Sequence, residues 1–221
     1  VDQVLVMTYD LGTSTYSGFN SPLRPGECSL TQTWTAWTIE DHGPHLWVNL
    51  GVNRDKIALS VPFYGWDYTG IDGPCQLGRT GANYLKFPDA YNRKNIYTSA
   101  YHWDSRSQVP WLGYTASGTR HFVTYDDETS ITAKINYAKS LNLGGIMIYD
   151  LESGWFHTQI QNYPRDPLLQ TVKSAVWGSG TGDTQPPTAS ITSPLNGTTV
   201  LGTITIAASA SDNVGVTRVD F

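Results

Sequence analysis

Apolar residues gather in three short runs within the first 150 positions of the chain. The runs lie at residues 4–8, 56–61 ("KIALSV") and 145–149 ("GIMIY"). Continuous apolar runs of this length are typical of strands that are buried on both faces, as in parallel sheets covered by helices. The pattern therefore predicts three parallel strands. A helical pattern around residues 30–37, between the first two runs, is weak.

Two helices are predicted on either side of the third run. Before it, apolar side chains recur at helical spacing at Ile131, Ile135, Ala138 and Leu141. Thr129 or Ser130 can cap the start of this helix, and Gly144 can close its end. After the run, Asp166 can cap a second helix that ends before Gly178. Strands that alternate with helices predict an α/β sheet or barrel.

Residues 67–123 depart from this alternation. They are rich in glycine, tyrosine and short alternating pieces such as "NIYTSAYHW". This composition predicts a small antiparallel unit that is inserted between two elements of the larger fold. Insertions of this size commonly build one wall of a functional site.

The C-terminal end changes character again. Residues 179–187 contain no large apolar side chain and predict a flexible linker. Residues 188–221 then alternate apolar and polar positions, with turn sequences at 194–197 and 212–215. This alternation predicts the first strands of a β-sandwich that the chain does not complete.

The overall composition indicates a globular protein. Of the 221 residues, 39% are hydrophobic and 12% aromatic, which is enough to form a packed core. The net charge of -5 offers no attraction to phosphate backbones, so nucleic acid is not expected as a partner. The eight Trp and thirteen Tyr suit the apolar faces of sugars as readily as they suit a core.

The sequence indicates no metal site and no membrane segment. Cys28 and Cys75 lack C-x-x-C spacing, so they form either one disulfide or two thiols, and the five His lack the spacing of metal ligands. There is no apolar run of about eighteen residues and no leader pattern at the N-terminus. Because both ends of the chain fall within strand-like sequence, we expect it to be part of a longer polypeptide.

Polar residues follow each apolar run. Tyr9 and Asp10 follow the first run, Tyr64 follows the second, and Asp150 and Glu152 follow the third. Because the sites of parallel barrels lie at the carboxyl ends of the strands, these residues are candidates by position. The carboxylates alone would suggest a glycosidase with two catalytic acids. An equally good interpretation is that Asp150 and Glu152 cap or salt-bridge loop backbone.

Four stretches of the chain match the motifs of one enzyme family in the same order. They are "MTYD" at 7–10, "GFNSPL" at 18–23, "KIALSVPFYGW" at 56–66, and the segment 122–154, which ends in "GIMIYDLESG". They resemble the sixth barrel strand, the motif that follows it, the seventh strand, and the eighth strand with its preceding helix in glycoside hydrolase family 18, the chitinase family. The resemblance covers residues 1 to about 178.

The resemblance implies an α/β fold: a partial (β/α)8 TIM barrel with its last three strands and an inserted α+β domain. Residues 1–66 would then hold barrel strands six and seven, residues 67–123 the insertion domain, and residues 124–178 strand eight and the terminal helix. Residues 188–221 resemble the bacterial immunoglobulin-like or fibronectin-like modules of secreted polysaccharide hydrolases. This likeness implies an extracellular, bacterial protein.

The resemblance also implies a reaction: substrate-assisted, retaining hydrolysis of β-1,4-linked N-acetylglucosamine polymers, without a cofactor. Tyr9 matches the tyrosine that holds the acetamido group of the sugar. Asp10 matches the aspartate that hydrogen-bonds the sugar and orients that group. The expected partner is chitin or an N-acetylglucosamine oligosaccharide. The candidate substrate-binding residues are Met7, Tyr64, Trp66, Trp103, Trp111 and Tyr149.

Two departures from the family pattern matter. Tyr149 stands where the family has a tryptophan under the sugar, and Tyr offers less stacking area. The motif D-x-x-D-x-D-x-E, whose glutamate is the acid, does not occur in the 221 residues. The acidic cluster "YDDE" at 125–128 lacks its spacing, and we expect it to shape the wall of the cleft and precede a helix.

We therefore expect the C-terminal part of a chitinase-like enzyme. It should be inactive by itself, because no residue here matches the glutamate that donates the proton in that family. Three strands of eight also leave open sheet edges, so we do not expect this part to fold without the upstream part that completes the barrel. Two other hypotheses remain. The protein is a carbohydrate-binding relative that does not hydrolyse its ligand, or it is a family member that acts on peptidoglycan or N-glycan cores.

Overall fold

The computed structural model describes residues 1–12, 17–26, 37–178, 186–212, 216 and 219. These residues form two compact units, Val1–Val176 and Trp177–Phe221, which are described separately. The helix expected around residues 30–37 and most of the expected linker lie outside the described residues. So does Cys28, whereas Cys75 is disulfide-bonded.

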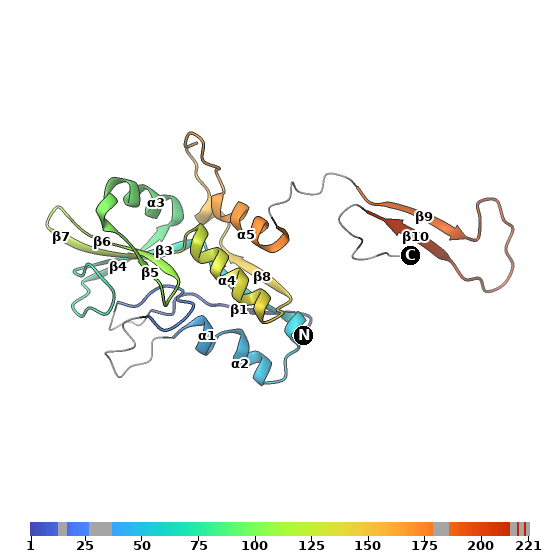
Figure 1. The fold of residues 1–221 in the computed structure, drawn as a ribbon, viewed down its shortest axis with the longest axis horizontal. Coiled ribbons are helices and arrows are strands. Elements are labelled where there is room, and N and C mark those ends of the chain that lie inside the picture. The colour runs from blue at the N-terminus through green and yellow to red at the C-terminus, as the bar shows by residue number, and fades with distance from the viewer. Residues whose placement is uncertain (13–16, 27–36, 179–185, 213–215, 217–218, 220–221) are drawn as a thin grey trace. The chain divides into compact units, whose positions relative to one another are not determined.

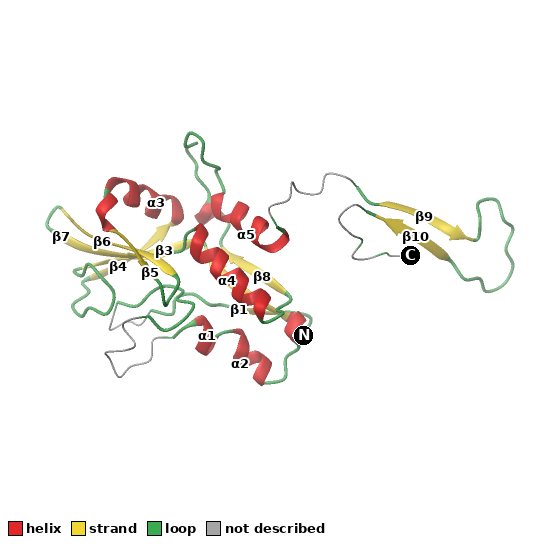
Figure 2. Ribbon diagram, viewed as in Figure 1, coloured by secondary structure: helices red, strands yellow, loops and turns green. Residues whose placement is uncertain are grey.

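A three-stranded parallel sheet forms the centre of the first unit (Figure 1, Figure 2). Its strands are β1 (Val4–Val6), β2 (Ile57–Pro62) and β8 (Gly145–Tyr149), in the order β1-β2-β8. Both pairs are parallel, so the prediction of three parallel strands from three apolar runs is confirmed. That these strands are three of eight in a barrel stays a prediction.

Burial differs between the central strand and the outer ones. Every residue of β2 is buried, as predicted. The prediction is wrong for β1 and β8, because Leu5 is 51% exposed and β8 is only partly covered. The reason is position: among the described residues, β1 and β8 each pair with β2 alone, so one edge of each strand is uncovered.

Short helices and a 3-10 turn connect β1 to β2. They are α1 (Ile39–His42), α2 (Pro44–Asn49) and η2 (Arg54–Lys56). Longer helices flank β8: α4 (Glu128–Ser140) before it and α5 (Pro167–Trp177) after it, as the apolar spacing predicted. Together the strands and helices confirm the expected α/β class. Core side chains shared by β2, α4 and α5 include Leu59, Val61, Ile131, Ile135, Leu168 and Val172.

The ends of α4 differ from the prediction. Asp127, not Thr129 or Ser130, is the N-cap: its carboxylate accepts hydrogen bonds from the backbone N–H groups of both those residues. The helix ends at Ser140, before the predicted Gly144. Gly144 has another role, because a Cβ there would lie 1.7 Å from the carbonyl oxygen of Asp55. Only glycine allows this close approach between the α4–β8 turn and the start of β2.

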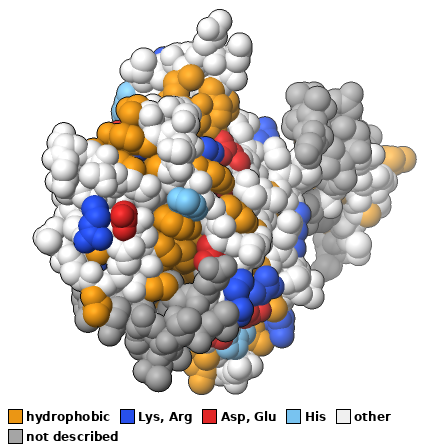
Figure 3. Space-filling view, turned by 60° about the vertical axis from the view of Figure 1, so that its left-hand side comes forward, with side chains coloured by type: hydrophobic (Ala, Val, Ile, Leu, Met, Phe, Trp, Pro, Cys, Tyr) orange, Lys and Arg blue, Asp and Glu red, His pale blue; other side chains and the backbone are white. Residues whose placement is uncertain are grey.

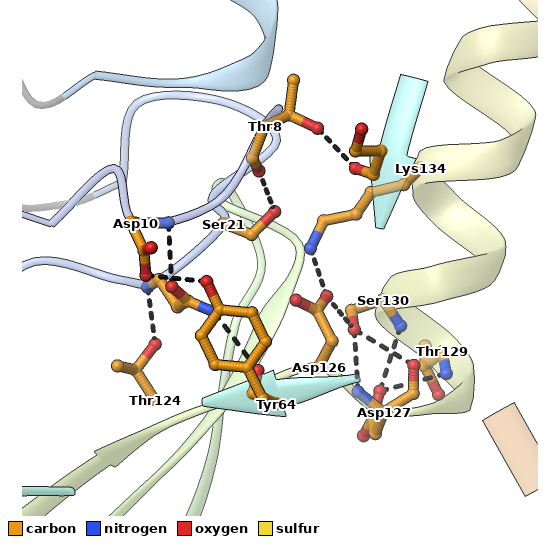
Figure 4. A network of polar contacts seen from close by, with 12 residues as sticks. Thr8, Asp10, Ser21, Tyr64, Thr124, Asp126, Asp127, Thr129, Ser130 and Lys134 are labelled. Atoms are coloured by element: carbon orange, nitrogen blue, oxygen red, sulfur yellow. Dashed lines mark hydrogen bonds and ion pairs between the residues drawn. The ribbon is translucent and has the colours of Figure 1, made fainter. Parts of the chain in front are cut away.

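The acidic cluster before α4 is internal. Asp126 forms an ion pair with Lys134, and both side chains are fully buried. Ser130 Oγ donates to the same carboxylate at 2.6 Å, so three residues spaced four apart form one buried network (Figure 4). The cluster does precede a helix, as expected. However, Asp126 and Asp127 are 2% and 5% exposed, so the expectation that they form a cleft wall is wrong.

The insertion is an antiparallel sheet of five strands in the order β4-β3-β7-β6-β5. The bounds are β3 (Tyr64–Thr69), β4 (Gly81–Lys86), β5 (Tyr101–Asp104), β6 (Val109–Ala116) and β7 (Thr119–Thr124). Helix α3 (Phe87–Ile96) and the turn η3 (Thr98–Ala100) connect β4 to β5. The predicted antiparallel unit is therefore confirmed, and Phe63 alone separates its first strand from β2.

The two faces of this sheet have different neighbours. Helix α3 covers one face, where Arg93 pairs with Asp67 and the ring of Tyr97 stacks on that of Tyr114 at 4.1 Å. The other face carries a separate hydrophobic cluster. Phe19, from the loop after β1, packs into that cluster. Its members are Phe19, Tyr68, Ile71, Val109 and Phe122, with Trp66 and Trp111 packed against them.

The second unit contains an antiparallel hairpin of β9 (Thr188–Ser193) and β10 (Ala207–Ser211). The predicted turn at 194–197 is present, since the N–H of Thr198 donates to the carbonyl of Leu195. The turn predicted at 212–215 lies mostly outside the described residues. Within the described ranges, no helix has both the length and the apolar character needed to cross a membrane.

Candidate active site

The parallel strands bring the predicted residues together at one end of the sheet. Tyr9 and Asp10 lie just beyond β1, Tyr64 lies just beyond β2, and Tyr149 is the last residue of β8. Because all three strands run in the same direction, their carboxyl ends share one edge of the sheet. The register places Tyr149 opposite Pro62, two residues before Tyr64.

Three tyrosine rings form the centre of the site. Tyr9 stacks on Tyr149 with ring centroids 5.3 Å apart, and Tyr64 stands edge-on to both at 5.8 Å. Tyr84, from β4 of the inserted sheet, stacks on Tyr64 at 4.9 Å. These separations are those of favourable aromatic pairs, so the rings fix one another's orientation. The hydroxyl of Tyr9 makes no hydrogen bond to another described residue and is available to a ligand.

Asp10 is held from several sides (Figure 4). Its backbone has φ = 58°, a left-handed conformation that Asp tolerates better than most residues. Its N–H donates to Asn20 Oδ1 at 3.0 Å. Its carboxylate Oδ1 accepts two hydrogen bonds, from the Tyr64 hydroxyl at 2.8 Å and from Trp66 Nε1 at 2.9 Å.

Asn20 is a site residue that the sequence analysis missed. It is buried, and besides holding Asp10 it donates from Nδ2 to the carbonyl of Tyr64 at 3.2 Å. Its own N–H donates to Thr124 Oγ1 at 2.9 Å. Asn20 thus ties the loop after β1 to its neighbours in two ways: its side chain bonds Asp10 and Tyr64, and its backbone bonds Thr124 of the inserted sheet. The only sequence signal was its place in "GFNSPL", which carries the family resemblance.

Both central phenols keep their protons at neutral pH. Burial is the main cause that raises the pKa of Tyr9, followed by the nearby Tyr149 and the charge of Asp10. Burial also raises the pKa of Tyr64 far above its usual value, together with its hydrogen bond to the Asp10 carboxylate. Each phenol therefore acts as a hydrogen-bond donor over the whole physiological range.

The two other carboxylates have structural partners. Asp150 Oδ1 accepts from the N–H of Ser153 at 2.7 Å, which caps the 3-10 turn η4 (Glu152–Gly154). Glu152 forms an ion pair with Lys86 at 2.5 Å, and this pair lowers the pKa of the Glu152 carboxyl. The interpretation of these acids as loop-capping and salt-bridging groups is therefore confirmed.

The remaining predicted residues divide between the faces of the inserted sheet. Trp66 and Trp111 are both paired with Thr124, so they share the face that carries the site, and Trp111 stacks on His102 at 4.0 Å. Trp103 is paired with Pro110, the residue before Trp111 on β6. Because successive side chains of a strand point to opposite faces, Trp103 lies on the face opposite to Trp111. The structure therefore does not bring Trp103 to the other candidates.

Met7 lies before Tyr9 and is 69% exposed. Figure 3 shows hydrophobic side chains gathered in a band across one face of the molecule, with charged side chains beside and within it. Among the described residues, the aromatic side chains of the candidate site with large exposure are Tyr84 and Tyr149, at 44% and 47%, and such rings suit the apolar faces of sugars. In the described residues, no group of three or more His, Cys, Asp or Glu side chains is arranged to hold a metal ion.

Comparison with known protein families identifies the first unit. The model for glycosyl hydrolases family 18 matches residues 1–154. The chain belongs to glycosyl hydrolase family 18. A second model, for a bacterial Ig domain, matches residues 187–221 and contains the β9–β10 hairpin. The resemblances seen in the sequence are thus confirmed for both parts of this family 18 chain.

Relatives of this family 18 chain include proteins named as chitinases and chitobiases. Chitinase A1 of Niallia circulans is 33% identical over 98% of the chain but only 32% of its own length. A probable endochitinase of Caenorhabditis elegans is 27% identical, with 80% of the chain and 30% of that protein covered. Mouse di-N-acetylchitobiase is 24% identical, with 80% and 48% covered. The chain spans about a third to a half of these relatives.

Solved structures agree on the fold. The Ostrinia furnacalis Group IV chitinase in complex with allosamidin has a TM-score of 0.68 and 26% identity, with 80% of this chain and 50% of that chain covered. Human YKL-39, described as a pseudo-chitinase with retained chitooligosaccharide binding, has a TM-score of 0.66 and 22% identity, with the same coverage. At that identity, the second similarity shows the fold alone.

Proposed function

We propose that this chain is the C-terminal part of a catalytic domain that hydrolyses β-1,4-linked N-acetylglucosamine polymers. One observation carries the proposal. Tyr9, Asp10 and Tyr64 meet at the carboxyl ends of adjacent parallel strands, in a chain that belongs to glycosyl hydrolase family 18. Similarity to chitinases from several organisms supports chitin or its oligosaccharides as the substrate class.

The proposed chemistry uses the substrate's own acetamido group. Its carbonyl oxygen forms a bond to the anomeric carbon while the glycosidic bond breaks, and an acid gives its proton to the leaving oxygen. Water then attacks the same carbon and gives a proton to the deprotonated acid, the acetamido group is regenerated, and the configuration is retained. Tyr9 donates a hydrogen bond that holds the acetamido group for attack. Asp10 binds the sugar and orients the same group, close to the apolar ring cluster where its charge is effective.

The acid lies outside residues 1–221 in this proposal. The motif D-x-x-D-x-D-x-E is absent from the sequence, and Asp150 and Glu152 are engaged by Ser153 and Lys86. We propose that β1, β2 and β8 are the last three strands of a barrel whose other strands come from the upstream polypeptide. The uncovered edges of β1 and β8, the 51% exposure of Leu5 and the partial coverage of the relatives support this.

A second candidate is a carbohydrate-binding protein without turnover. The site has the aromatic residues for such a role, and Tyr149 replaces the larger ring expected under the sugar. Family members that act on peptidoglycan or N-glycan cores would share the acetamido chemistry. A glutamate at the end of the fourth barrel strand in the upstream sequence favours the hydrolase, and another residue there favours the binding protein.

The proposed location is extracellular, in a bacterium. A polymer such as chitin is too large to enter a cell intact, so an enzyme that degrades it must reach it outside. The match of residues 187–221 to a bacterial Ig domain supports a module that follows the catalytic domain.

The test is turnover of chitin oligosaccharides by the complete polypeptide and its Tyr9→Phe variant. Removal of one hydrogen-bond donor to the reacting group should lower kcat by about 100-fold or more, without loss of thermal stability. Tyr137→Phe on α4 is the matched control, because Tyr137 is half-buried and the charged groups near it, Glu40, Arg24 and Asp41, do not belong to the site. Equal kcat for the Tyr9→Phe and Tyr137→Phe variants would contradict the proposed catalytic role of Tyr9. Tight binding of the oligosaccharide without turnover by the wild type would favour the second candidate.

A further inference from the structure

Trp66 has an interaction that differs from the stacking role expected for it. Its indole N–H donates to Asp10 Oδ1 at 2.9 Å. Its ring stands nearly perpendicular to two neighbouring tyrosines, at 79° to Tyr64 and 87° to Tyr84, and lies parallel to a third, Tyr68, with ring centroids 6.5 Å apart. The polar edge of the indole, rather than its face, is therefore directed at the predicted catalytic aspartate.

The two donors to Asp10 come from one strand. Tyr64 and Trp66 are two residues apart on β3, so their side chains lie on the same face of the inserted sheet. Asp10 lies in the loop after β1, which belongs to the parallel sheet. The pair of hydrogen bonds therefore sets a carboxylate of the parallel sheet against a strand of the inserted sheet (Figure 4 shows the Tyr64 bond).

The pattern of bonds leaves one carboxylate oxygen unused. Both donors reach Oδ1, at 2.8 and 2.9 Å, and among the described residues Oδ2 accepts no hydrogen bond. Two donors at one oxygen prevent the carboxylate from turning about its Cβ–Cγ bond, which a single donor would allow. The backbone of Asp10 is also fixed, because its N–H is bound to Asn20. Neither donor carries a charge, so the full negative charge of the carboxylate remains available.

We propose that Trp66 is a positioning residue for Asp10: with Tyr64 it clamps Oδ1, so that Oδ2 alone is presented to a donor group of the sugar. This inference rests on the proposed function, in which Asp10 binds the sugar and orients its acetamido group. It assigns Trp66 a hydrogen-bonding role within the protein in place of a stacking platform under the substrate. It also predicts that the indole N–H matters more than the aromatic area.

The first experiment separates the N–H from the ring. Trp66→Phe in the complete polypeptide keeps an aromatic ring and removes the donor. We expect kcat on chitin oligosaccharides to fall about tenfold or more, the factor expected for a lost hydrogen bond to a charged acceptor, with KM changed less. Trp47→Phe on α2 is the matched control and should behave as wild type, since Trp47 is a partly exposed tryptophan away from the site.

A double-mutant cycle tests whether Trp66 acts through Asp10. In the Asp10→Asn background the carboxylate is gone, so the further change Trp66→Phe should lower kcat/KM by less than twofold. If the two effects multiply instead, Trp66 acts independently and the proposal is wrong. Should Trp66→Phe fail to fold, Tyr64→Phe removes the other donor to the same oxygen, and the same cycle with Asp10→Asn applies.

A second readout does not depend on activity. The indole ¹H–¹⁵N resonance of Trp66, identified as the one lost in Trp66→Phe, should shift in Asp10→Asn, while that of Trp47 should stay in place. A Trp66 resonance that is unchanged by Asp10→Asn overturns the proposal. If the wild type shows no turnover, the proposed function has failed, and this resonance still decides whether Trp66 holds Asp10.

Discussion

The buried ion pair between Asp126 and Lys134 allows a quantitative test of what stabilises the first unit. Lys134 lies on α4 and Asp126 lies just before the helix, two turns away, with Ser130 between them. Both charged side chains are fully buried. We expect Lys134→Met, which keeps an unbranched side chain only one atom shorter and removes the charge, to destabilise the protein strongly.

The magnitude follows from what Asp126 keeps after the substitution. Its Oδ1 would retain only the hydrogen bond from Ser130 Oγ at 2.6 Å, and Oδ2 has no partner among the described residues. A buried charge without its partner costs about 3–5 kcal/mol. With a urea dependence of about 1–3 kcal/mol per molar, the unfolding midpoint should fall by about 1–5 M.

The assay is urea unfolding of the complete polypeptide, followed by tryptophan fluorescence. Lys173→Met on α5 is the control, because Lys173 is exposed and a surface substitution should change stability by less than about 0.5 kcal/mol. The double variant Asp126→Ala with Lys134→Met removes both charges and should be more stable than Lys134→Met alone. If Lys134→Met and Lys173→Met unfold at the same urea concentration, the reasoning about the buried pair is refuted.

Two further predictions concern the candidate site. Asn20→Ala would leave the buried carbonyl of Tyr64 without this partner, at about 1–3 kcal/mol, and would also remove the part-buried bond to the N–H of Asp10, at a smaller cost; a thermal melt that matches wild type would contradict this. The pKa of Tyr9 in the folded protein is raised above its usual value of 10.0. The phenol therefore stays protonated below about pH 10, and it stops donating a hydrogen bond only as the pH rises through this higher pKa. The ratio of kcat/KM between wild type and Tyr9→Phe should therefore stay constant up to about pH 10, and a ratio that falls near pH 8 would contradict the raised pKa.

The elements with strong periodic patterns could be predicted from sequence. The fully buried β2 follows from an unbroken apolar run, and α4 follows from the spacing of Ile131, Ile135 and Ala138. The N-cap of α4 could not be chosen, because Asp127, Thr129 and Ser130 are all good caps by type. The choice among these three caps depends on tertiary contacts. Asp126, which precedes Asp127, forms a buried ion pair with Lys134 and so fixes the chain at the start of the helix.

The site was only partly predictable for a similar reason. Tyr9, Asp10 and Tyr64 were found because they follow apolar runs, and Tyr149 because the family resemblance expects a ring at the end of the third run. Trp103 was placed with Trp111 because both are tryptophans of the insertion, yet the face of a strand depends on register to a single residue. That register is set by the turn at 105–108, where the N–H of Gln108 donates to the carbonyl of Asp104 at 2.8 Å.

The inserted sheet and the loop beyond β8 are joined at two points. Tyr84 Oη and Ser153 Oγ are 2.7 Å apart, and Lys86 pairs with Glu152. Tyr84 also stacks on Tyr64, which contacts Tyr149. A tilt of strand β4 would therefore act on Tyr64, and through it on Tyr149, by ring contacts, and on the loop beyond β8 by a hydrogen bond and an ion pair. The inserted sheet and the tyrosines at the ends of the parallel strands should thus move as one rigid piece.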